Sequence, residues 1–483
     1  MEFKVTELPD TNIPASSLTR DDIAKEIPGL LSLYDEFPQI IYTASDPLFE
    51  TISPSFNRAT TTRPLAVVRA LEESHVQATI KAVQAAGLQF AIRSGGAEME
   101  GRNFRGIGSG VMIDTRSLCS IKVAEDKRSA VIGGGTIAGD LALALSREGA
   151  FTPVGWHPRL GYAGWSMAGG YGMYASSYGL GVDHILGVRI VLADGSVAVA
   201  DENSNQDLLW ALRGAGNGIW GVVTQFTIKT YPAPKLLIGS VKFAKKDWPA
   251  VMAEWAKNIE PNLPEELAGD IYFRNNVLEL PEMNILFAWC AKEGDDLKKG
   301  WEHFEKIKSL PGADVVRIGE SDFATFLMTE LTIQPGAFEC RGVITKGLTE
   351  RVASVLMNQW NEDPMLFMGI PSHFVHGKAA QPNPGSCFNL RYRHRLFPAY
   401  AHHVVLTRTK EGDDIEIGAI TKTMDAIKAT GDVYVGASYG NLIDSSNTDW
   451  EVTYGKENLN KLKELKKKYD PTNFFSRGYP VLV

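Results

Sequence analysis

Residues Gln89-Phe90-Ala91-Ile92 form a strand-like run that passes directly into the polar, glycine-rich sequence Arg93-Ser94-Gly95-Gly96-Ala97. Successive backbone N–H groups in such a loop can surround an anion, and Arg93 adds a positive charge. A second stretch, residues 155–172, holds six glycines in eighteen residues. A glycine costs about 0.5–1 kcal/mol inside a helix or strand, but it lets the backbone lie against a flat ligand. Together the two stretches indicate a site for a diphosphate-containing cofactor.

A third glycine-rich stretch supports a different interpretation. Gly133, Gly135 and Ala138 satisfy the GxGxxA form of the dinucleotide fingerprint between a predicted strand and a predicted helix. A nicotinamide-binding Rossmann domain also needs an acidic residue about 20 residues further on, at the end of a second strand. Residues 155–172 occupy that region instead. The Rossmann interpretation is therefore the weaker one.

Composition limits the class of protein. The 483 residues are too many for one typical core, so we expect two or three domains. The net charge of −8 argues against a nucleic-acid-binding protein. No segment reaches the ~18 uninterrupted apolar residues of a membrane span. The N-terminus lacks a signal-peptide core and the chain lacks Asn-x-Ser/Thr sequons, so we expect an intracellular, cytoplasmic location.

The chain divides at the proline-rich turn Tyr231-Pro232-Ala233-Pro234. Strands and helices alternate from Pro64 up to this turn, whereas the segment before Pro64 is punctuated by prolines and serines. Beyond the turn, strands and amphipathic helices continue without glycine loops, as in a second α+β unit. We expect an N-terminal wrapping segment, a cofactor domain, a substrate domain and a C-terminal segment that returns to the cofactor domain, at residues 1–60, 61–234, 235–434 and 435–483.

Several short motifs accompany the glycine-rich stretches. They are the strand ending at Asp114, Tyr178-Gly179-Leu180-Gly181-Val182-Asp183, Ala193-Asp194-Gly195, residues 207–214 and 217–223, and, near the C-terminus, Trp450, Tyr454-Gly455, Asn458 and Asp470-Pro471-Thr472-Asn473. In this order the first group resembles the PCMH-type FAD-binding domain of the vanillyl-alcohol-oxidase (VAO) superfamily. The C-terminal group resembles the berberine-bridge-enzyme-like oxidoreductases.

The resemblance implies an α+β, two-domain fold: a VAO/PCMH-type FAD-binding domain and an α+β substrate domain with an antiparallel sheet. It also implies the residues that contact FAD. Those expected along the pyrophosphate and flavin are Arg93, Ser94, Gly95, Gly96, Ala97, His157, Gly161, Gly164, Trp165, Gly169, Gly170 and Gly172. Those expected along the ADP half are Tyr178, Asp183, Ile185, Gly221, Val222 and Val223, while Tyr439 and Asn441 are expected beside the isoalloxazine.

The chain departs from the family at three positions. Ala97 stands where the family carries a histidine bonded to the flavin, and His157 stands where doubly linked members carry a cysteine bonded to it. Neither familiar covalent bond can form in its usual way, so we expect tightly but noncovalently bound FAD. Leu442 replaces the second tyrosine of the family's Tyr-x-Asn-Tyr sequence, which is often the substrate base.

The proton acceptor is therefore open. A base must come within hydrogen-bond reach of the substrate, and the substrate domain supplies titratable candidates. The candidate catalytic residues are Tyr439, His157, His394 and Tyr392, with His373 and His376 as further candidate bases. Side chains such as Tyr392, His394, His373 and His376 are more often packing or surface residues than catalysts. In the family, the position of Tyr439 is more often a flavin contact than a base. No histidine or cysteine pattern has metal-ligand spacing, so no metal site is expected.

These features predict an FAD-dependent oxidoreductase that transfers a hydride from a small or medium organic substrate to the flavin. Molecular oxygen is the expected reoxidant, and secondary metabolism is the expected setting. Fold alone does not fix function. The missing anchors leave a second hypothesis, a non-redox isomerase or cyclase that keeps the FAD fold as a scaffold. Substrate identity and oligomeric state do not follow from the sequence.

Overall fold

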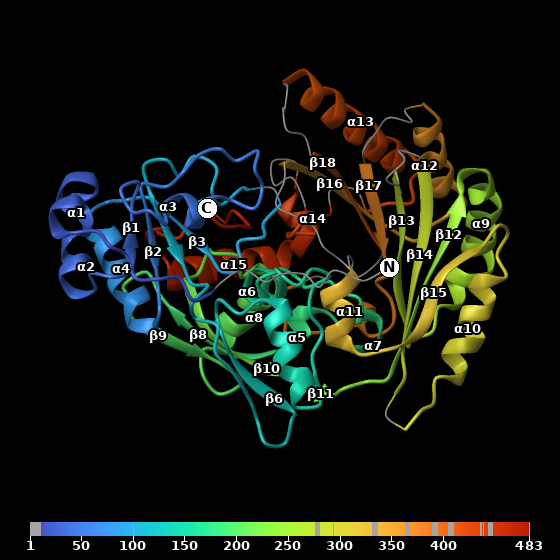
Figure 1. The fold of residues 1–483 in the computed structure, drawn as a ribbon, viewed down its shortest axis with the longest axis horizontal. Coiled ribbons are helices and arrows are strands. Elements are labelled where there is room, and N and C mark those ends of the chain that lie inside the picture. Colours follow the sequence, from blue (N-terminus) through green and yellow to red (C-terminus); the bar gives the residue numbers. More distant parts are fainter. Residues whose placement is uncertain are drawn as a thin grey trace.

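The computed structural model describes residues 11–99, 101–275, 281–292, 294–330, 337–362, 368–381, 383–388, 395–403, 410–434, 437, 439–442 and 448–482. Figure 1 shows two lobes side by side. The first lobe contains the N-terminal half of the chain together with the C-terminal helices, and the second contains one large sheet with helices on its outer side. The α+β class and the antiparallel sheet of the second lobe are confirmed.

Two main sheets build the first lobe. One has the order β1-β2-β4-β3, and the other has the order β5-β6-β10-β8-β9. Their bounds are β1 (Ile41–Tyr42), β2 (Ala66–Arg69), β3 (Phe90–Arg93), β4 (Val111–Asp114), β5 (Ile121–Val123), β6 (Ser129–Gly133), β8 (Ile185–Val191), β9 (Val197–Ala200) and β10 (Val222–Lys229). A short pair joins β7 (Ala150–Phe151) to β11 (Tyr231–Pro232). Strands β2, β3 and β4 run parallel, so their carboxyl ends share one edge.

The helices of the first lobe cover these sheets. Glu73 to Ala85 form α4, whose buried face carries Val76, Ile80 and Val83 at helical spacing. The other helices are α1 (Arg20–Glu26), α2 (Leu31–Glu36), α3 (Phe49–Ile52), α5 (Ala138–Arg147), α6 (Tyr162–Met167), α7 (Ala175–Tyr178), α8 (Gln206–Ala215), α11 (Phe323–Glu330), α14 (Trp450–Tyr454) and α15 (Lys456–Tyr469). Helix α15 lies against α8, and buried Lys466 donates to the carbonyl of Ile219, which fastens the C-terminal segment to this lobe.

A seven-stranded antiparallel sheet forms the second lobe, in the order β15-β12-β14-β13-β17-β18-β16. The strands are β12 (Leu236–Ala244), β13 (Leu267–Asn275), β14 (Pro281–Cys290), β15 (Asp314–Ser321), β16 (Ala337–Thr345), β17 (Met368–His373) and β18 (Arg395–His403). The helices that pack on it are α9 (Trp248–Glu254), α10 (Lys298–Lys308), α12 (Glu350–Glu362) and α13 (Lys410–Ala429).

Strand β13 shows how this sheet faces two environments. Successive side chains of a strand point to opposite faces. Ile271 and Phe273 belong to the core beneath the helices, whereas Asp270 bonds Tyr171 of the first lobe. The face opposite the helices therefore presents polar and aromatic groups toward the first lobe. None of the described helices has the length and apolar content needed to cross a bilayer.

Candidate functional site

A cavity of about 530 Å³ lies where the two lobes meet. Its volume falls within the ~300–1,000 Å³ of ligand pockets in proteins. The first lobe lines it with the glycine-rich loops, and the second lobe lines it with Tyr272 and Phe273 of β13 and His373 of β17. The C-terminal segment contributes Tyr439, Asn441 and residues 475–479. Three regions far apart in the sequence thus enclose one space.

The glycine-rich loops meet at backbone distance. A Cβ added to Gly95 would lie 2.2 Å from the backbone nitrogen of Gly161, and a Cβ added to Gly161 would lie 2.3 Å from that of Gly95. No side chain fits at either position without moving backbone. Gly96 adopts a positive φ of 78°, a conformation that favours glycine and turns the loop. The predicted loop therefore forms a wall of bare backbone.

Gly164 faces the cavity itself. It lies in α6, and a Cβ added there would come within 4 Å of a single protein atom, Ser94 Oγ, at 3.9 Å. The space over Gly164 belongs to the cavity and is not filled by packed protein. A flat ligand can therefore lie directly against this helix.

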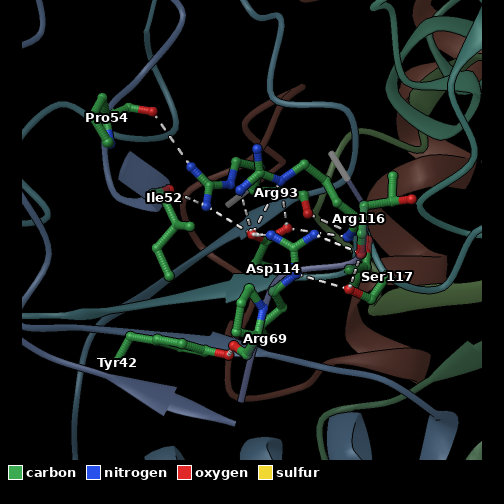
Figure 2. Close-up of polar contacts among 11 residues, drawn as sticks. Tyr42, Ile52, Pro54, Arg69, Arg93, Asp114, Arg116 and Ser117 are labelled. Atoms are coloured by element: carbon green, nitrogen blue, oxygen red, sulfur yellow. Dashed lines mark hydrogen bonds and ion pairs between the residues drawn. The ribbon is translucent and has the colours of Figure 1, made fainter. Parts of the chain in front are cut away.

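The Arg93 side chain turns away from the loop that it precedes. Its guanidinium donates to the Asp114 carboxylate at 2.7 Å and to the carbonyl of Ile52, as Figure 2 shows. The positive charge of Arg93, which was expected to contact a bound anion, is therefore paired with the buried carboxylate of Asp114. Direct contact with a ligand at this loop falls to the backbone N–H groups of residues 94–97.

On the opposite wall, His373 and Asp270 form a hydrogen-bonded pair. They are direct partners in the register of β13 and β17. His373 Nδ1 lies 2.6 Å from Asp270 Oδ2, and the Tyr171 hydroxyl donates to Asp270 Oδ1 at 2.7 Å. Asp270 is fully buried, and this burial raises its pKa, against the lowering effect of the His373 and Tyr171 hydrogen bonds. Because Nδ1 is held by Asp270, Nε2 is the His373 nitrogen left for the cavity.

Aromatic rings surround this pair. The Trp156 ring stacks at 6.1 Å from the ring of His373 and at 6.3 Å from that of Tyr171. Tyr272 meets Trp156 edge-on at 6.3 Å. All four residues line the cavity. The rings hold His373 in one orientation and give this wall a largely apolar, planar surface.

Tyr439 lies at the cavity with its hydroxyl already engaged. The oxygen accepts from the backbone N–H of Tyr171 at 2.8 Å and from that of Gly170 at 3.1 Å. Burial raises the pKa of Tyr439 above its ordinary value, so the phenol stays neutral. The ring packs against Gly169, where a Cβ would lie 2.8 Å from a ring carbon. This geometry favours a positioning role for Tyr439 over proton transfer.

The structure brings most of the predicted cofactor residues to the cavity. Those that line it are Arg93, Ser94, Gly95, Gly96, Ala97, His157, Gly161, Gly164, Trp165, Gly221, Val223 and Asn441. His157 is buried, and its Nδ1 accepts from the backbone N–H of Arg159 at 3.2 Å. Asn441 donates to the carbonyl of Trp165 at 3.0 Å, which ties the C-terminal segment to α6.

Other predicted residues lie elsewhere. Tyr178 packs against Phe151 and Tyr231, and Asp183 accepts hydrogen bonds from Leu180 and Asn383. The residues outside the cavity lining are Gly169, Gly170, Gly172, Tyr178, Asp183, Ile185 and Val222. Gly169 and Gly170 contact Tyr439. A Cβ at Gly172 would collide with the Val154 carbonyl. Ile185 and Val222 are core residues.

The candidate bases separate in the same way. His373 lines the cavity, whereas His376 lies with Nε2 at 3.1 Å from the Pro264 carbonyl and outside the lining. Tyr392 and His394 lie outside the described residues. Asp270 and Tyr171 were not predicted. The one sequence signal for Asp270 is a carboxylate within the otherwise uncharged residues 267–273 of β13, since a buried charge needs a specific partner.

Comparison with known proteins identifies two of the three regions that enclose the cavity. Residues 64–201 match the FAD binding domain family, and residues 438–478 match the family described as berberine and berberine like. The chain is an FAD-dependent oxidoreductase, and its C-terminal region is similar to the berberine-like family. The FAD-linked oxidoreductase aurO of Gibberella zeae is 29% identical over 92% of this chain and 86% of its own length. The (R)-6-hydroxynicotine oxidase of Paenarthrobacter nicotinovorans is 33% identical, over 43% of this chain and 44% of its own length.

Solved structures share the fold of this oxidoreductase. The 6-hydroxy-D-nicotine oxidase of Arthrobacter nicotinovorans superposes with a TM-score of 0.80 at 20% identity, over 91% of this chain and 97% of that one. The BBE-like 1 protein of Physcomitrella patens does so with a TM-score of 0.79 at 21% identity, over 92% and 97%. The residues present also fit FAD: the backbone of residues 94–97 suits a diphosphate, and the open face over Gly164 suits a flat ring.

Replacement of Gly164 by leucine should fill part of the cofactor space. We expect Gly164→Leu to lower FAD affinity by about tenfold or more, because overpacking costs about 1–3 kcal/mol. The helix should survive, since leucine is the better helix former. Gly418→Leu is the matched control, because a Cβ there meets nothing within 4 Å and Gly418 lies in α13, outside the cavity lining. Wild-type FAD content in purified Gly164→Leu would contradict this placement.

Proposed function

We propose that this oxidoreductase binds FAD noncovalently in the cavity and oxidises a small organic substrate at an activated C–H, alcohol or amine carbon. When bound, FAD supplies the acceptor for the hydride and returns to its oxidised form with molecular oxygen. The observation that carries the proposal is that His373, hydrogen-bonded to buried Asp270, lines the same cavity as the glycine-rich loops. Two of the similar proteins are named as hydroxynicotine oxidases, which supports an oxidase reaction on a small cyclic compound.

His373 is the proposed proton acceptor. The Asp270 carboxylate accepts the hydrogen bond from Nδ1–H, so the neutral imidazole presents the lone pair of Nε2 to the substrate. When Nε2 takes the substrate proton, Asp270 lies at 2.6 Å to stabilise the imidazolium. Tyr171 donates to the second oxygen of Asp270 and so fixes the orientation of the carboxylate.

The walls of the cavity support a mainly apolar, planar substrate. Trp156, Tyr171 and Tyr272 offer ring faces and edges around His373. Such walls exclude water, which strengthens the electrostatic interaction between Asp270 and a charged His373. The substrate class that fits is a small aryl or cyclic amine, or a benzylic alcohol.

Two side chains at the cavity support the noncovalent attachment that we propose. Ala97 has no atom able to bond the flavin, and the resemblance in sequence implies that His157 stands at the position of the cysteine of doubly linked enzymes. Both residues line the cavity, so both positions lie within reach of the cofactor. Shape and backbone contacts then hold FAD in place of a covalent tether.

Replacement of His373 by glutamine should slow substrate oxidation. Anaerobic mixing with a panel of cyclic aryl amines and benzylic alcohols should bleach the visible flavin band of the wild type with at least one compound. For that compound we expect His373→Gln to bleach about 100-fold more slowly at equal FAD content, the scale of general base catalysis. His303→Gln, on α10 and stacked on Trp289, should react as the wild type does. Turnover with no bleaching in any protein would overturn the redox function, whereas wild-type bleaching by His373→Gln would overturn only the proton acceptor.

Acid precipitation tests the mode of attachment. Trichloroacetic acid unfolds the protein and releases any flavin that is held only by the folded site. We expect all of the yellow colour in the supernatant and FAD of unmodified mass by mass spectrometry. Flavin that remains in the washed pellet would show a covalent bond, and the labelled peptide would then reveal whether His157 carries it.

A further inference from the structure

Three arginine side chains converge on one buried carboxylate behind the cofactor loop. Arg93 and Arg116 each contact Asp114 Oδ2 at 2.7 Å, and Arg69 lies at 3.6 Å from the same oxygen. Figure 2 shows the guanidinium groups around Asp114. Asp114 is fully buried, and the side chains of Arg69, Arg93 and Arg116 are exposed by only 1%, 3% and 16%. Arg93 and Arg116 alone outnumber the carboxylate, and Arg69 adds a third positive charge.

The cluster occupies the edge of the parallel sheet where ligands bind in open α/β sheets. Arg69, Arg93 and Asp114 are the last residues of β2, β3 and β4, and they are partners in the register of these strands. Ser94 follows Arg93 directly, and Thr115 lies between Asp114 and Arg116; both residues line the cavity. The excess charge therefore lies directly behind the wall that the cofactor contacts.

Excess buried charge destabilises a protein unless an opposite charge is near. Neutral carbonyls supply part of the compensation, since Arg93 donates to Ile52 and Arg69 donates to Thr11 at 3.0 Å. The pKa of Arg93 nevertheless falls to about 10, because burial and the neighbouring Arg116 charge oppose its protonation. A bound anion in the cavity would offset this excess.

We propose that the Arg69–Arg93–Arg116 cluster around Asp114 is the electrostatic half of the FAD diphosphate site, acting across the wall formed by residues 94–97 and Thr115. The backbone N–H groups contact the diphosphate, and the cluster supplies the positive field behind them. This inference rests on the placement of FAD in the cavity, but its test needs no turnover.

Arg116 is the residue to change. Among the described contacts its side chain donates only to Asp114, so Arg116→Met leaves that carboxylate paired with Arg93 and Arg69. FAD and riboflavin, which lacks the diphosphate, are each titrated into the full-length apoprotein. Fluorescence then measures the affinity for each ligand. We expect Arg116→Met to weaken FAD binding about tenfold and riboflavin binding less than twofold. Arg116→Lys, which keeps the charge, should stay within about threefold of the wild type for both ligands.

Arg20→Met controls for net charge, because Arg20 of α1 forms an exposed ion pair with Asp35 of α2 and lies outside the cavity lining. Equal losses of affinity for FAD and riboflavin, or no loss for FAD, would overturn the proposal and leave Arg116 a structural residue.

If Arg116→Met does not fold, a second measurement on the wild-type apoprotein tests the proposal. Added inorganic pyrophosphate should raise the melting temperature of the apoprotein and compete with FAD for binding. Absence of both effects would contradict it. A wild type that binds neither flavin would refute the cofactor placement itself.

Discussion

The close approach of Gly95 to Gly161 is the constraint on which the rest of the site depends. A side chain at either position would collide with the backbone of the other at 2.2 or 2.3 Å. The contact joins the loop after β3 to the start of α6, two segments that belong to different parts of the first lobe. Once they touch, the backbone of residues 94–97 and the open face of Gly164 line the same space. Any larger residue at Gly95 or Gly161 would push the two segments apart and disrupt this part of the cavity lining.

Three parts of the molecule contribute different kinds of chemical group to that cavity. The small parallel sheet places charge at its carboxyl edge, where Asp114 gathers the arginines. The glycine loops expose bare backbone. The seven-stranded sheet contributes the hydrogen-bonded pair of Asp270 and His373, which is held by Tyr171 from the first lobe. In the proposed function, the first lobe holds the cofactor and the seven-stranded sheet supplies the proton acceptor.

The glycine-rich part of the cavity lining was easier to predict from the sequence than the His373–Asp270 pair. Gly95, Gly96, Gly161 and Gly164 belong to local runs whose composition makes sense only at a close backbone approach. Asp270 and His373 are 103 residues apart and meet only because β13 and β17 are neighbours in register. Strand order in an antiparallel sheet cannot be read from spacing, so His373 remained one base candidate among several.

Predictions transferred from the resemblance were less secure where side chains, and not backbone, make the contact. Tyr178 and Asp183 match family motifs in sequence, but they pack on other protein groups and lie outside the cavity lining. Arg93 was expected to face an anion, yet its guanidinium donates to Asp114. The two residues are 21 positions apart in the sequence, so their contact in the fold could not be predicted from spacing.

The most direct measurement is a crystal structure of the purified, FAD-loaded protein. The account predicts the diphosphate against the backbone of residues 94–97, the ring over Gly164, and the opposite face of the ring open toward His373 Nε2. A diphosphate bound away from that loop, or a ring separated from His373 by other side chains, would contradict it.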